Sequence, residues 1–227
     1  MNNKEDFQKL NEHFCEKAQT KQDVYATTLN AFNSLKKHAA MVIDGLKSER
    51  KPGKHDLDLV YSESGAYEAE IRFSGDALSF QMHSNVFAFP SEHGIYKSAI
   101  VQEDKSAGFV GMVLIYNFLA DSLRFNRLAD SGYLLGRLFI NKDGHFFMDG
   151  NRQFSFLFND FAHQKFTEAA AEKIIQTAMM HAVDFDLFVP PFDAVKEITL
   201  HQKMVQQGTT AVKTGKRLGF DYDGRTE

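Results

Sequence analysis

The chain has 227 residues, of which 43% are hydrophobic and 25% are charged, a balance typical of a folded globular protein. Its formal net charge is −4, and the acidic excess lies in the central part, which repels phosphate backbones and argues against a nucleic-acid partner. Its apolar runs stop far short of the roughly 20 residues that a membrane helix needs, which argues against a membrane partner.

Cysteine use and the first residues suggest a compartment. The single cysteine, Cys15, cannot form a disulfide within the chain and cannot build a thiolate metal cluster. The first residues are polar and lack the basic and apolar regions of a secretory signal. We therefore expect a cytoplasmic protein without a metal site or a cofactor.

Residues 1–52 are predicted to form N-terminal helices. Apolar residues recur three and four positions apart from Val24 to Leu46, which predicts a helix that begins near Thr20 and ends before Pro52. A second apolar series lies ahead of it: Phe7, Leu10 and Phe14. This series predicts either a separate short helix or the first part of one long helix.

Residues 56–160 are predicted to form a meandering antiparallel sheet of about six or seven strands, because the apolar period changes from helical spacing to two. A two-residue turn at Gly75-Asp76 would make Ile71 and Phe80 cross-strand neighbours on a buried face. The opposite face of that hairpin is polar. We therefore expect one face of the sheet to be core and the other to be wet in this part of the chain.

Two later segments, 109–116 and 133–140, are apolar on both faces and are predicted to be central strands that are covered above and below. A tight turn is predicted at residues 141–144, and residues 119–131 fit either a strand or a helical turn. Alternating phenylalanines predict one more strand beyond the turn: Phe154, Phe156 and Phe158.

C-terminal helices are predicted over residues 166–204 and are expected to pack on the sheet. Thr167 can cap a helix that continues to about Val183, and a further helix is expected over residues 192–204. Residues 205–227 are polar and predict a loosely held tail. The sequence thus predicts a single α+β domain over residues 1–227, with helices before and after an antiparallel sheet.

Three polar residues near the central strands are candidate ligand-binding residues. Arg137 interrupts an otherwise apolar strand, so it must meet a carboxylate, reach solvent at the sheet margin or bind an anionic ligand. His145 and Asp149 are four residues apart, and in a strand they would share a face. Motifs for a catalytic nucleophile, a phosphate-binding loop or a paired metal ligand do not occur, so we assign no catalytic residue and no metal ligand.

The functional hypothesis is a non-enzymatic binding or protein-interaction module whose partner is a protein or a small apolar ligand. The alternative is an enzyme of unrecognised type with a polar site near the central strands. A homodimer is also predicted, through the helix at residues 20–46 or an uncovered sheet face, because few long helices are predicted to cover the sheet. The terminal helical segments of one chain are the alternative cover.

Overall fold

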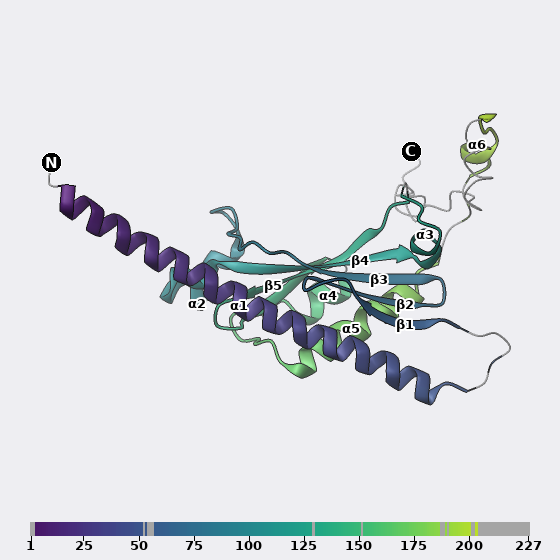
Figure 1. Ribbon diagram of the computed structural model, residues 1–227, viewed down its shortest axis with the longest axis horizontal. Helices are drawn as coiled ribbons and strands as arrows, with labels where there is room; N and C mark the ends of the chain where they lie inside the picture. The colour runs from purple at the N-terminus through teal and green to yellow at the C-terminus, as the bar shows by residue number, and fades with distance from the viewer. Residues whose placement is uncertain are drawn as a thin grey trace.

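The computed structural model describes residues 3–51, 53, 57–128, 130–150, 152–186, 189, 191–200 and 203. It confirms the α+β fold: a long N-terminal helix precedes a six-stranded antiparallel sheet, and further helices follow (Figure 1). The helices are α1 (Asn3–Glu49), α2 (Ala99–Glu103), α3 (Ala120–Arg124), α4 (Arg152–Leu157), α5 (Glu168–Val183) and α6 (Phe192–Val195). The strands are β1 (Leu59–Glu63), β2 (Glu68–Phe73), β3 (Asp76–Met82), β4 (Val110–Leu119), β5 (Tyr133–Asn141) and β6 (Phe146–Gly150). Two 3-10 helices flank α2: η1 (Gly94–Lys97) and η2 (Lys105–Gly108).

The sheet is a meander, as the alternation predicted. The spatial order of its strands is β1-β2-β3-β4-β5-β6, and every neighbouring pair is antiparallel. One face packs against α1 and α5, which lie side by side and are joined by an ion pair between Lys37 and Glu168 at 3.0 Å. This layer forms the main core, in which Phe32, Leu35 and Ile174 are almost completely buried.

The N-terminal residues form one continuous helix rather than two. α1 spans 47 residues, and it packs on the sheet through a buried series from Val24 to Ile43. The apolar side of residues 20–46, which was one predicted dimer surface, is therefore buried against the chain's own sheet and α5. The structure resolves the choice that the sequence left open in favour of a single long helix.

Gly111 brings α1 unusually close to β4. A Cβ atom placed on Gly111 would lie 2.0 Å from Oγ1 of Thr28 and 2.7 Å from its Cβ. Thr28 is fully buried, and its hydroxyl donates to the carbonyl of Val24 at 2.7 Å. Only a glycine fits between the strand and the helix at this point.

The second face of β4 and β5 is covered by residues 87–109, which carry η1, α2 and η2. Ile95, Val101 and Ala107 from this segment pack on Val110 and Phe139 in a second apolar cluster. The sequence predicted that both faces of these strands are covered, either by a second subunit or by the terminal helices of the same chain. The structure instead supplies this cover, at one end of the sheet, from the segment between β3 and β4.

The register predicted for the β2–β3 hairpin was wrong by two residues. The turn lies at Ser74-Gly75, Ile71 pairs with Leu78, and Phe80 pairs with Ala69. Ser74 adopts a positive φ of 52°, which a two-residue hairpin turn requires at its first position. Asp76 belongs to β3, where it pairs with Phe73, and its carboxylate accepts a hydrogen bond from the buried Asn117 amide at 3.2 Å. A shift of two keeps the faces unchanged, so Ile71 and Phe80 are both buried.

The strand predicted at Phe154, Phe156 and Phe158 was also wrong, because residues 152–157 form α4. Phe154 and Phe158 are four residues apart and both face the core, whereas Phe156 is 81% exposed. The sheet ends at Gly150, whose φ of 133° is reserved for glycine and whose added Cβ would lie 2.5 Å from the Leu135 carbonyl. β6 ends there, and α4 begins at Arg152.

The outer edge of β6 is not open. Residues 158–166 run along it, and the amide of Met148 donates to the carbonyl of Phe158 at 2.7 Å. The amide of Phe146 donates to Gln164, and that of Phe166 donates to Gly144. This segment therefore supplies hydrogen-bonding partners to β6 that a seventh strand would otherwise provide.

The helix after this segment begins where the sequence placed it. Thr167 caps α5, since its hydroxyl oxygen accepts a hydrogen bond from the Ala170 amide at 3.2 Å. α6 lies at the start of the last predicted helix and ends at Val195. The predicted tail, 205–227, lies outside the described residues.

Candidate interaction surface

Arg137 meets a carboxylate, which was one of the three alternatives for it. Arg137 on β5 and Asp149 on β6 are direct cross-strand partners on the face opposite the main core. The guanidinium donates to both carboxylate oxygens, at 2.9 and 2.5 Å, and lies 5.3 Å from the centre of the Phe139 ring. The hydrogen bonds to Asp149 raise the pKa of Arg137 above its usual value. The two side chains are 43% and 41% exposed, so the pair lies at the sheet surface.

His145 does not join this pair. It precedes β6, and its ring Nδ1 lies 3.2 Å from the carbonyl oxygen of Phe161. Its backbone amide donates to Oδ1 of Asn141 at 2.9 Å, which fixes it in the turn between β5 and β6. Of the three candidate residues, the structure therefore brings Arg137 and Asp149 together and places His145 in a separate set of contacts.

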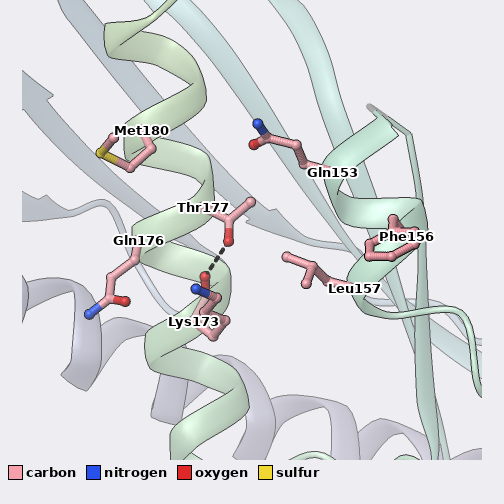
Figure 2. A pocket seen from close by; sticks show the side chains of 7 residues that line it. All are labelled: Gln153, Phe156, Leu157, Lys173, Gln176, Thr177 and Met180. Atoms are coloured by element: carbon pink, nitrogen blue, oxygen red, sulfur yellow. Dashed lines mark hydrogen bonds between the residues drawn. The ribbon is translucent and has the colours of Figure 1, made fainter.

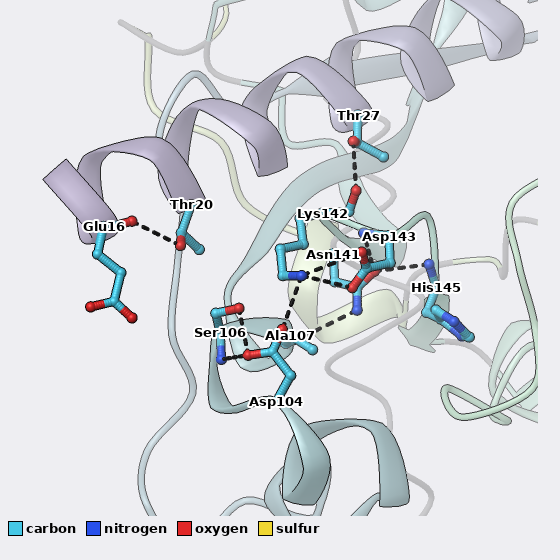
Figure 3. A network of polar contacts seen from close by, with 10 residues as sticks. All are labelled: Glu16, Thr20, Thr27, Asp104, Ser106, Ala107, Asn141, Lys142, Asp143 and His145. Carbon is cyan, nitrogen blue, oxygen red and sulfur yellow. Dashed lines mark hydrogen bonds and ion pairs between the residues drawn. The ribbon is translucent and has the colours of Figure 1, made fainter.

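The turn that holds His145 is the centre of a polar network that anchors α1 (Figure 3). Asn141 is fully buried, and its amide donates to the Ala107 carbonyl at 3.3 Å while its oxygen accepts from the backbone of Asp143. From α1, the Thr27 hydroxyl donates to the carbonyl of Lys142 at 3.0 Å. The network thus fixes α1, η2 and the β5–β6 turn to one another at the end of the sheet.

Asp104 is one of the charged residues of this network. It accepts hydrogen bonds from the backbone and hydroxyl of Ser106, at 2.8 and 2.6 Å, and lies 2.9 Å from the Lys142 ammonium. These hydrogen bonds, those from Ser106 first, lower the pKa of Asp104 to about 2. The ionised form of Asp104 is therefore favoured more strongly in the folded state than in the unfolded state.

Replacing Asp104 with Asn is expected to lower stability in a pH-dependent way. Because the pKa of Asp104 is lower in the folded state than in the unfolded state, its ionised carboxylate stabilises the fold at pH values above the unfolded-state pKa of about 4. This stabilisation is lost as the pH falls toward the folded-state pKa of about 2. The urea midpoint of Asp104→Asn should lie below that of the wild type at about pH 6, and the gap should narrow at about pH 3. A gap of the same size at both pH values would contradict the assignment.

A hollow of about 340 Å³ lies between α4 and α5, and we call it the α4/α5 hollow (Figure 2). Phe156 and Leu157 line it from α4, and Met180 lines it from α5. The Thr177 hydroxyl donates back to the Lys173 carbonyl at 2.7 Å, so this polar group is already satisfied within the helix. The lining of this hollow thus combines apolar side chains with the polar ones of Gln153, Lys173 and Gln176.

A second hollow, of about 650 Å³, adjoins α1 and is called the α1 hollow. Lys21, Gln22 and Tyr25 line it from the helix, and Tyr67 lies opposite. The hydroxyl groups of Tyr25 and Tyr67 are hydrogen-bonded at 2.7 Å. The remaining lining comes from residues 84–87, after β3.

The N-terminal part of α1 extends well beyond the sheet (Figure 1). Three large apolar side chains on it are exposed: Phe7 by 65%, Leu10 by 63% and Phe14 by 66%. We call them the apolar stripe, because their spacing of three and four places them along one side of the helix. The sequence predicted that these residues are helical but not that they lack cover. Their distinguishing signal in the sequence was an apolar series ahead of Thr20, where a helix had been predicted to begin.

Neither composition nor homology adds a function to this geometry. In the described part of the chain, none of the helices combines the length and apolarity needed to cross a membrane, and no three His, Cys, Asp or Glu side chains gather as a metal site. Comparisons with protein-family models, with curated proteins and with solved structures give no significant match.

Proposed function

We propose that the protein is a non-enzymatic interaction module that binds a protein partner through the apolar stripe of α1. The observation that carries this proposal is the exposure of Phe7, Leu10 and Phe14 at nearly two thirds each, on one side of a helix that extends past the sheet. Burial of such a side chain contributes about 1.5–3 kcal/mol when it is complete. Three of them on one stripe are the usual anchors of a helix that docks on another surface.

The base of this helix is firmly held, which suits a binding element. Thr20 is where burial of α1 begins, and the hydrogen bond from Thr27 to the β5–β6 turn fixes the helix just beyond it. A free helix of the length that extends beyond this point is only marginally stable in water. Because the part of α1 that follows Thr20 is packed on the sheet, the projecting part loses less conformational entropy when a partner binds.

The alternative enzyme is supported less well by the same geometry. Arg137 and Asp149 neutralise each other, and the His145 ring contacts the carbonyl of Phe161. A substrate would have to separate Arg137 from Asp149, and it would still not contact His145 in the same site. The arrangement therefore favours stabilisation of the sheet and the turn by these residues.

Replacing Phe7, Leu10 and Phe14 together with Ala tests the proposal, because Ala preserves the helix and removes the apolar area. Affinity capture from cells that express the tagged protein, followed by mass spectrometry, should recover partners with the wild type and lose them with this variant. The matched control replaces Phe156, Leu157 and Met180 with Ala, which removes exposed apolar side chains from the α4/α5 hollow. Equal recovery by the wild type and the stripe variant would overturn the proposal.

A further inference from the structure

We infer that the partner of the apolar stripe is the same stripe of a second copy of this chain, packed antiparallel. This inference rests on the proposed function and names the occupant of that surface. The stripe continues the side of α1 that packs on the sheet: Leu10 is two heptads before Val24, and Phe14 is two heptads before Thr28, and both later residues are fully buried. The stripe thus lies where the packing side of α1 passes beyond the edge of its own sheet.

The charges that bracket the stripe are complementary only in the antiparallel direction. Asp6 lies at its N-terminal end, and Lys17 and Lys21 lie one heptad after Leu10 and Phe14, on the same side of the helix. In an antiparallel pair, Asp6 of each copy approaches Lys17 of the other. A parallel pair would place Asp6 against Asp6 and Lys17 against Lys17, which is unfavourable.

The α1 hollow lies where the end of the second helix would reach. If Leu10 faces Phe14 of the second copy, then residue 3 of that copy faces Lys21, which lines the hollow with Tyr25 and Tyr67.

The surface formed by two such stripes is small for a protein interface. Stable interfaces bury about 1,200–2,000 Å² in total, and two stripes of three side chains each bury less than this. The dimer is therefore weak and concentration-dependent, with a dissociation constant in the micromolar range.

Sedimentation or light scattering of the purified full chain from about 5 to about 200 µM tests the inference. The mass should rise from 25.8 kDa toward twice that value. Asp6→Lys and Lys17→Asp should each weaken dimerisation about three- to tenfold, and the double variant should restore it, because the pair is re-formed with its signs exchanged. The stripe variant with three Ala should remain monomeric. Asp44→Lys, at a position on α1 that is 79% exposed, is the control and should dimerise like the wild type.

Three outcomes would overturn the inference. A mass of 25.8 kDa at every concentration excludes the dimer, and the proposed function then stands or falls by affinity capture. A dimer that is unaffected by the three Ala substitutions uses another surface. A dimer that Asp6→Lys does not weaken, or that the double variant does not restore, is not antiparallel.

Discussion

Phe154→Ala is expected to lower the free energy of unfolding by about 3–5 kcal/mol, because a completely buried phenyl ring is removed from the core. The ring lies in the main core, and Gly136 of β5 is close enough that an added Cβ would touch it at 3.4 Å. The neighbouring groups are closely packed, so they cannot move far enough to fill the cavity that the substitution leaves. Urea unfolding of the wild type and the variant measures the effect.

Phe156→Ala is the matched control in the same helix. Phe156 is 81% exposed, so its loss should change the free energy of unfolding by less than about 0.5 kcal/mol. In a strand, Phe154 and Phe156 would share a face and respond alike; in a helix they point in nearly opposite directions. Similar losses for the two variants would contradict the assignment of residues 152–157 to a helix.

Gly111→Ala is expected to destabilise the protein by about 3 kcal/mol, at the upper end of the usual cost of overpacking. The new methyl group would collide with Thr28, whose Cβ and Cγ2 would both lie 2.7 Å away. The clash falls on a buried helix that is packed against a sheet, so neither side can move freely. The midpoint of urea unfolding should fall accordingly.

Two further variants separate this clash from a general effect of replacing glycine. Gly45→Ala, in an open part of α1 with nothing within 4 Å, should be neutral or stabilising by up to about 1 kcal/mol. Adding Thr28→Ala to Gly111→Ala removes two of the three closest atoms and should recover part of the loss. A double variant no more stable than Gly111→Ala would show that Thr28 is not the obstacle.

Local patterns in the sequence sufficed for most elements of the fold. Alternation of apolar residues identified the strands that became β2 and β3, segments that are apolar on both faces identified β4 and β5, and Thr167 marked the start of α5. These signals succeed because a buried strand face requires apolar side chains and the first turn of a helix requires a hydrogen-bond acceptor for its free amides. The tight turns predicted near residues 75 and 141–144 indicated antiparallel hairpins and hence a meander.

Errors arose where two structures satisfy the same local pattern. Ile71 and Phe80 face the core in both hairpin registers, whereas in the observed register Asp76 lies in β3 and accepts a hydrogen bond from Asn117, 41 residues away. Phe154 and Phe158 share a side in a strand and in a helix alike, because residues four apart meet in both. Long-range contacts of this kind are not visible in a single sequence.

The candidate site was predicted only in part, for a similar reason. That Arg137 meets a carboxylate was one of three alternatives that the sequence left open, and its partner Asp149 had been a candidate through its spacing from His145 instead. His145 was grouped with them because it was counted as part of a strand, whereas it belongs to the preceding turn. The exposure of Phe7, Leu10 and Phe14 depends on where the sheet ends relative to α1, which no local pattern reveals.

The segment that runs along the outer edge of β6 limits how this protein can aggregate. A strand edge with free amide and carbonyl groups is a template for pairing with another molecule, and it can lead to continuous sheets that pass from chain to chain. In this protein the amides of Phe146 and Met148 are already bonded to Gln164 and Phe158. Growth of the sheet from this side would first have to strip away residues 158–166, so the six-stranded sheet is closed to edge-to-edge addition at β6.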